Sequence, residues 1–79
     1  MKLSVYSLKK VLFQGEAELF NCKTAMGEIT ILDNHEPLIG VLTKGTIRLK
    51  DEKGQEHFFE VTSGFLEVLK TNEVRAIVD

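Results

Sequence analysis

The sequence predicts an all-β domain, a flattened β-sandwich or barrel of two packed, mainly antiparallel sheets with about nine to ten short strands. Apolar residues recur at every second position through much of the 79-residue chain, which is the period of a strand with one buried face. Turn-forming residues interrupt these segments at nearly regular intervals, and no segment shows the period of an amphipathic helix. The length, without a linker or repeat, predicts one domain over residues 1–79.

The alternation defines the strands in order along the chain. They are predicted at residues 2–6, 11–13, 16–25, 28–32, 38–43, 46–50, 55–61, 65–70 and 73–79. Residues 33–37 are the clearest loop, because they are polar and end at the only proline. The apolar positions change phase around Leu19 and Phe20, which predicts a β-bulge or burial on both faces. Gly40, inside an apolar strand, predicts a bulge or a close backbone approach, whereas the other five glycines are expected to serve turns.

Composition excludes several classes of protein. The formal net charge of −2 argues against a nucleic-acid-binding domain, which usually carries a basic face. A single cysteine, Cys22, cannot form an internal disulfide, so we expect a reducing compartment and a buried, hydrophobe-like thiol. The first twelve residues alternate in polarity and do not resemble a signal peptide. No segment approaches the roughly 20 consecutive apolar residues of a membrane span.

Residues that could carry chemistry are few. Cys22, His35 and His57 lie on different segments and form no metal-binding spacing, and no nucleophile elbow or phosphate-binding glycine loop is present. The glutamates mostly alternate with apolar residues, so they are expected to face solvent. Lys53 lies in a predicted hairpin, where small β-sandwich carrier domains display a modified lysine, but its neighbours are Glu52 and Gly54 rather than methionines. We therefore expect no catalytic residue, metal or cofactor.

The segment from Gly27 to Leu38, Gly-Glu-Ile-Thr-Ile-Leu-Asp-Asn-His-Glu-Pro-Leu, is the most distinctive in the chain. It resembles the signature of the rotary, F-type ATP synthase epsilon subunit, within its N-terminal β-sandwich domain. Further motifs of that family are matched at the start of the chain and at residues 44–48, 63–68 and 72–78. The resemblance covers essentially the whole chain, and the order and spacing of the motifs make it specific.

The resemblance implies a non-catalytic central-stalk subunit that couples the gamma subunit to the membrane rotor ring of a proton- or sodium-driven ATP synthase. It implies a peripheral place at the cytoplasmic face of a bacterial membrane, without insertion or secretion. The implied rotor-ring contacts are Glu28, Asp33, Asn34 and His35. Gamma-subunit contacts are expected through an exposed apolar patch, for which the candidates are Val41, Leu42, Phe58 and Phe59.

Family members commonly continue into a C-terminal helical hairpin that restrains ATP hydrolysis and, in some members, binds ATP. The last predicted strand ends at Asp79, so we expect neither that arm nor a nucleotide site within these residues. The alternatives are a stand-alone β-sandwich adaptor with a different partner, or a carrier domain modified at Lys53.

Overall fold

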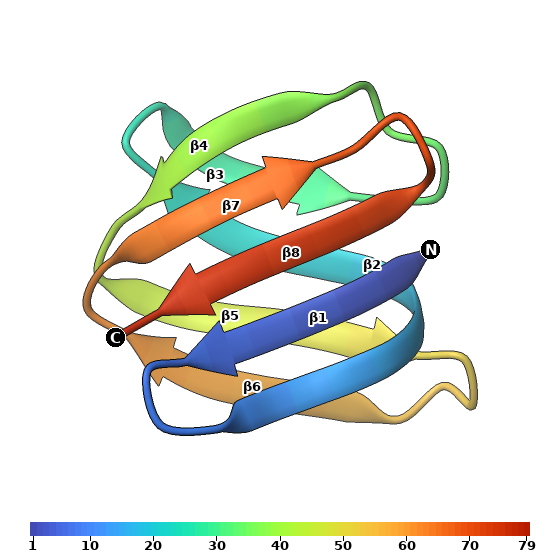
Figure 1. The fold of residues 1–79 in the computed structure, drawn as a ribbon, viewed down its shortest axis with the longest axis horizontal. Helices are drawn as coiled ribbons and strands as arrows, with labels where there is room; N and C mark the ends of the chain where they lie inside the picture. The colour runs from blue at the N-terminus through green and yellow to red at the C-terminus, as the bar shows by residue number, and fades with distance from the viewer.

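The computed structural model describes all of residues 1–79 as eight β-strands without a helix (Figure 1). The strands are β1 (Lys2–Ser7), β2 (Val11–Thr24), β3 (Gly27–Ile31), β4 (Leu38–Leu42), β5 (Gly45–Asp51), β6 (Glu56–Val61), β7 (Gly64–Val68) and β8 (Glu73–Val78). No helix that could cross a membrane is therefore present.

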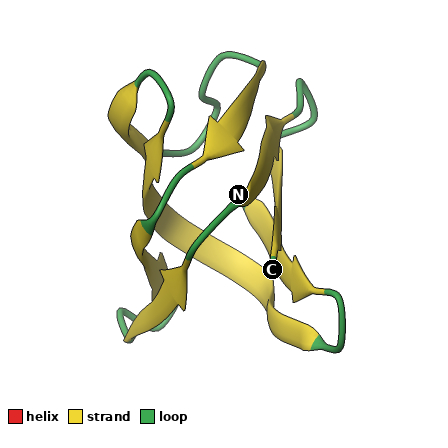
Figure 2. Ribbon diagram, turned by 90° about the vertical axis from the view of Figure 1, so that its left-hand side faces the viewer, coloured by secondary structure: helices red, strands yellow, loops and turns green.

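The strands form two packed layers, which Figure 2 shows from the side. The first layer has the order β4-β7-β8-β1, followed by the first half of β2, and lies toward the viewer in Figure 1. The second layer contains β3, the second half of β2, β5 and β6. All paired strands are antiparallel except β1 and β8, which run parallel. The predicted fold class, two packed and mainly antiparallel layers, is confirmed.

The predicted number of strands is too high, because β2 is one strand of 14 residues rather than two short ones. Gln14 and Gly15 do not form a turn. They continue the pairing with β1, where Gly15 lies opposite Leu3. The expected bulge is present, with its register shift between Ala17 and Leu19. At this point β2 passes from the first layer into the second, which explains the change of phase in the sequence.

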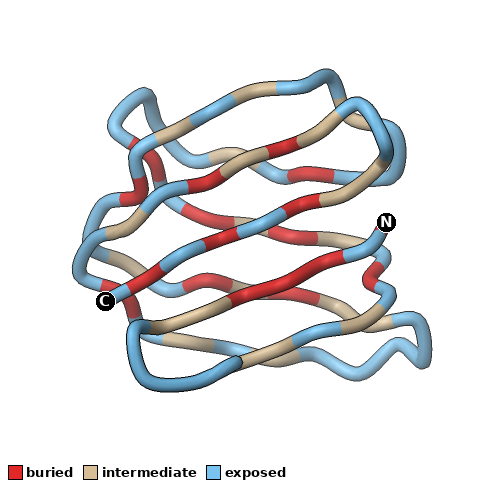
Figure 3. The backbone as a smooth tube through the Cα atoms, viewed as in Figure 1, coloured by how far each residue is buried: buried red, intermediate tan, exposed pale blue.

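The core lies between the layers and is built from alternate residues of the strands (Figure 3). Its 16 buried apolar side chains form a single cluster. The largest that are fully buried include Phe20, Leu3, Ile31, Leu49 and Leu66, which come from five different strands. Because both inner faces are covered, the surfaces available to another molecule are the outer faces, the edges and the loops.

A close backbone approach occurs at Gly64 rather than at Gly40. A Cβ atom added to Gly64 would lie 2.3 Å from the carbonyl oxygen of Ile77, so only glycine fits without movement of the backbone. A Cβ on Gly40 would make ordinary contacts, the nearest at 3.7 Å to Thr24. Gly40 pairs with Leu66 in an unbroken ladder between β4 and β7. The bulge or close approach predicted at Gly40 is therefore wrong.

Candidate functional site

The loop between β3 and β4 is held by a polar network at one end of the sandwich, which we name the loop end. Asp33 Oδ1 accepts hydrogen bonds from the Met1 amine and from Asn72 Nδ2, the latter at 3.1 Å. Asn72 Oδ1 in turn accepts from the backbone N–H of Asn34 at 2.7 Å. These bonds join the loop to the β7–β8 turn and to the first residue. The hydrogen bond from the Met1 amine, followed by that from Asn72, lowers the pKa of Asp33.

His35 lies in the same loop and interacts with its own backbone. The backbone N–H of His35 donates to the carbonyl oxygen of Leu32 at 3.2 Å, and the ring Nδ1 lies 2.8 Å from the carbonyl oxygen of Glu36. Because a carbonyl oxygen only accepts, this contact requires the proton on Nδ1. Nε2 has no such contact and is free to meet another molecule.

Glu28 lies at the other end of β3. It pairs with Lys23, next to the turn that joins β2 to β3, and its Oε2 accepts from Asn21 Nδ2 at 3.0 Å. Three residue steps, about 10 Å, separate Glu28 from Ile31 at the end of β3, and His35 lies in the loop beyond that end. Both flank the outer edge of β3, because β3 has only β2 as a neighbour. The structure therefore brings Asp33, Asn34 and His35 together but leaves Glu28 apart from them.

The four candidates for the gamma-subunit contact do not share a surface. Val41 is exposed on the first layer, and Phe58 is exposed on the second. Leu42, the last residue of β4, is only 2% exposed, because its side chain points into the core. Phe59 is partly buried against the same core. The prediction is therefore wrong for Leu42, which packs in the core, whereas Phe59 points inward from β6 but keeps part of its surface exposed and stays a candidate.

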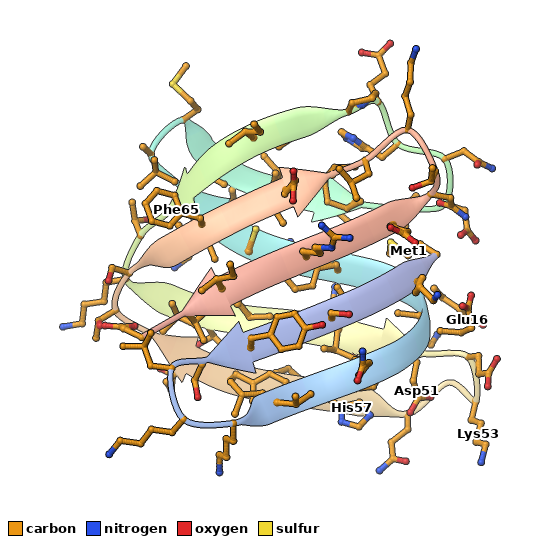
Figure 4. All side chains as sticks on the ribbon, in the orientation of Figure 1. Met1, Glu16, Asp51, Lys53, His57 and Phe65 are labelled. Atoms are coloured by element: carbon orange, nitrogen blue, oxygen red, sulfur yellow. The ribbon has the colours of Figure 1, made fainter.

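A second group of exposed apolar residues, with the half-buried Tyr6 among them, lies on the outer face of the first layer, and sequence reasoning missed most of it. Strand register places Val41 opposite Phe65, Phe65 opposite Ile77, Ile77 opposite Tyr6, and Tyr6 opposite Val11. We name these five residues the apolar row; Phe65, near the start of β7, is labelled in Figure 4. The alternation in the sequence could have assigned each residue to an outer face, but only the pairing register reveals the row.

The residues considered for chemistry remain apart. Cys22 is fully buried, and its burial, with a smaller effect of the Glu28 charge, raises the pKa of the thiol to about 11. His57 Nε2 lies 2.9 Å from Asp51 Oδ2, and its ring packs edge-on against Phe13. His35 is in the β3–β4 loop, and no three His, Cys, Asp or Glu side chains converge to hold a metal. Figure 4 shows Lys53 projecting from the hairpin, away from the apolar row.

The family model for the beta-sandwich domain of the ATP synthase delta/epsilon chain matches residues 1–79. The chain belongs to this family. The resemblance inferred from residues 27–38 is thus confirmed over the whole sequence.

Curated relatives are ATP synthase epsilon chains of bacteria. That of Clostridium novyi is 38% identical over 78 residues, which cover 99% of this chain and 59% of the relative. That of Alkalilimnicola ehrlichii is 32% identical over 79 residues, which cover all of this chain and 56% of the relative. The chain therefore spans somewhat more than half the length of these two relatives.

Solved structures share the fold at lower identity. A chain of the Euglena gracilis mitochondrial ATP synthase, in a structure of OSCP, F1 and the c-ring, matches with a TM-score of 0.90 and 22% identity over 99% of this chain and 49% of its own. A chain of the Tetrahymena thermophila mitochondrial ATP synthase, in a structure of the central stalk and c-ring, matches with a TM-score of 0.82 and 18% identity. The match covers 99% of this chain and 62% of the Tetrahymena chain. These two matches show that chains in mitochondrial ATP synthases share this fold.

Proposed function

We propose that this chain is a non-catalytic subunit of the central stalk of a proton- or sodium-driven ATP synthase, where it joins the gamma subunit to the membrane rotor ring. The family match over residues 1–79 carries the proposal. Two structural neighbours from assemblies that contain the c-ring support it. Because the curated relatives are bacterial, we place the chain at the cytoplasmic face of a bacterial membrane, held there by its partners.

The position of the ring-contact candidates suggests how the domain would dock. Glu28 and the Asp33–His35 segment flank opposite ends of the outer edge of β3. A flat ring surface that touches both must meet the molecule along β3, at its open edge or at the adjoining outer face, where Glu28 bonds with Asn21. We therefore propose docking along β3, with Asp33 and Asn34 holding the loop in place and with Glu28 and His35 meeting the polar loops of the ring.

Binding of the chain to a detergent-purified rotor ring bearing the gamma subunit tests the proposal. We expect Glu28→Ala and His35→Ala each to weaken binding by up to about fivefold, because exposed polar pairs contribute up to about 1 kcal/mol. Glu52→Ala, in the distant β5–β6 hairpin, is the control and should bind like the unchanged chain. Thermal unfolding should leave all three variants equally stable.

Three results would contradict the proposal at different levels. Failure of the unchanged chain to bind either gamma or the gamma–ring assembly would reject the central-stalk function. Weakening by only one of Glu28→Ala and His35→Ala would reject docking along β3. A large loss of thermal stability in Glu28→Ala would instead identify its bond with Asn21 as a structural one.

A further inference from the structure

A hollow lined mainly by polar side chains lies on the first layer, where β1 runs between β8 and β2 (Figure 1). We name it the polar hollow. Lys2 and Tyr6 lie two residues before and after Ser4, on the same face of β1. Strand register places Arg75 of β8 and Gln14 of β2 on either side of Ser4. One short side chain is thus surrounded by four longer ones, which leaves a volume of about 180 Å³ above it.

The side chains that line the polar hollow have few hydrogen bonds with the rest of the chain. Ser4 is only 8% exposed, and its hydroxyl takes part in none of the side-chain hydrogen bonds of the chain. The same is true of the side chains of Lys2, Tyr6 and Gln14. A buried hydroxyl normally has a partner, because its burial without one costs free energy. Since Ser4 lines the hollow, a molecule bound there can supply that partner.

The charge of the lining is positive. The ammonium of Lys2 and the guanidinium of Arg75 are opposed by one carboxylate, that of Glu73, so the net charge is +1. Arg75 lies 3.6 Å from Glu67 and 3.7 Å from Glu73, distances too long for hydrogen bonds. The N–H donors of its guanidinium therefore remain available to another acceptor.

A small oxyanion matches this lining in charge, hydrogen bonding and size. Its oxygens only accept hydrogen bonds, whereas the ammonium, guanidinium, hydroxyl and amide groups of the hollow can all donate. The forked donors of an arginine suit phosphate oxygens, and a lysine adds a point charge. Pockets for drug-sized ligands have volumes of about 300–1,000 Å³, so this hollow suits an ion better than a nucleotide.

A second polar hollow, beside the β5–β6 hairpin, has the opposite charge. It has a volume of about 240 Å³, and the carboxylates of Glu16, Asp51 and Glu52 line it together with one cation, Lys53. Both oxygens of Asp51 already meet donors of the hairpin or the ring of His57. This hollow would repel an anion, so the two hollows distinguish specific binding from a general attraction to lysine and arginine.

We propose that the polar hollow binds a small inorganic oxyanion and that phosphate is the anion that fits it. Arg75 and Lys2 provide the positive charge, and the Ser4 hydroxyl donates from the floor. The Gln14 amide and the Tyr6 hydroxyl donate from the sides. This inference goes beyond the proposed function and does not depend on it, because every group of the site belongs to this chain.

Titration of the isotope-labelled chain with sodium phosphate, followed by amide chemical shifts at constant ionic strength, tests the site. We expect saturable shifts around Ser4 and Arg75 with a dissociation constant of about 1–10 mM, because solvent-exposed ionic contacts are individually weak. Arg75→Gln should weaken binding about fivefold, whereas Arg48→Gln, on the second layer, is the control and should leave it unchanged. Shifts spread evenly over the lysines and arginines, or equal binding by Arg75→Gln, would overturn the inference.

Two further variants test the floor and the charge of the polar hollow. Ser4→Ala removes the hydroxyl and should weaken binding about threefold. Glu73→Gln removes the opposing charge and should strengthen it about threefold, with Glu52→Gln in the second hollow as the control. Thermal unfolding should show that each variant is folded at the temperature of the titration. Unchanged affinity in both Ser4→Ala and Glu73→Gln would place the anion elsewhere and overturn the site.

Comparison of anions tests the identity of the ligand. Phosphate should bind more tightly than acetate, because it carries more charge and more acceptor oxygens. ADP should bind no more tightly than phosphate, because the hollow is too small for the nucleoside. Equal binding of acetate would overturn phosphate in favour of a carboxylate, and clearly tighter binding of ADP would overturn it in favour of a nucleotide.

Discussion

At the start of β7, the missing side chain of Gly64 makes room for the carbonyl group of Ile77. Any Cβ at this position requires a shift of β7 or β8. The sequence does not reveal this constraint, because there Gly64 is recognisable only as a turn residue. Gly40, one strand away in the same layer, has space for a methyl group. The close approach predicted for Gly40 is therefore found at Gly64 instead.

We expect Gly64→Ala to lower the free energy of unfolding by about 1–3 kcal/mol, the usual range for an overpacked site. Gly40→Ala should be neutral or stabilising by up to about 1 kcal/mol, because alanine restricts the unfolded chain. Urea unfolding of both variants checks this. Equal stability of Gly64→Ala and the unchanged chain would show that the backbone relaxes without cost.

Cys22 should behave as an inert core residue. Its thiol is fully buried, and its pKa of about 11 leaves little thiolate at neutral pH. We expect a thiol reagent at pH 8 to label native protein only at the rate of transient unfolding and to label denatured protein at once. Rapid labelling of the native protein would show that the core opens near β2.

The β5–β6 hairpin is organised by one carboxylate. Asp51 Oδ1 accepts from the N–H groups of Lys53 and Gln55, each at 2.9 Å, while Oδ2 meets His57. The bond with His57 is the largest cause that holds the pKa of Asp51 below its ordinary value of 3.8. The sequence indicates the hairpin through its Asp-Glu-Lys-Gly turn, but it does not show that Asp51 and His57 face one another.

Because the folded state lowers the pKa of Asp51, its contribution to stability is present above the unfolded value and is lost as the pH falls through the folded value. We expect Asp51→Asn to be less stable than the unchanged chain at pH 7, and this difference to shrink below about pH 4. Urea unfolding across this pH range measures it, with Glu52→Gln as the control. If the two free energies of unfolding differ by the same amount at every pH, the hydrogen-bond geometry of Asp51, rather than its charge, provides the stability.

The strands themselves were largely predictable, because period-two alternation is a local property of the chain. β3 to β8 lie close to their predicted ranges. The error at β2 has a physical reason. A glycine after a short apolar segment usually indicates a turn, but Gly15 pairs with Leu3 of β1 and continues the strand. The inward orientation of Leu42 and Phe59 was missed because strand phase is ambiguous within continuous apolar runs.

At the scale of the whole molecule, the sequence indicated the family but not the surfaces. The Gly27–Leu38 signature was recognisable because its residues are contiguous. The apolar row was not, since Val41, Phe65, Ile77, Tyr6 and Val11 come from five strands. Their proximity depends on which strands are neighbours and in which register. Strand order and register are long-range properties, because they depend on how segments far apart in the sequence pack around the core.

The parallel pairing of β1 with β8 also bears on how the molecule is made. β1 can form a hairpin with β2 early, but its other edge stays open until β8 has been synthesised. Completion of the first layer must therefore wait for Val78 to leave the ribosome. Folds dominated by such distant pairings reach the native state in milliseconds to seconds. During that delay the exposed edge of β1 is open to pairing with other chains, so aggregation competes with folding until β8 is in place.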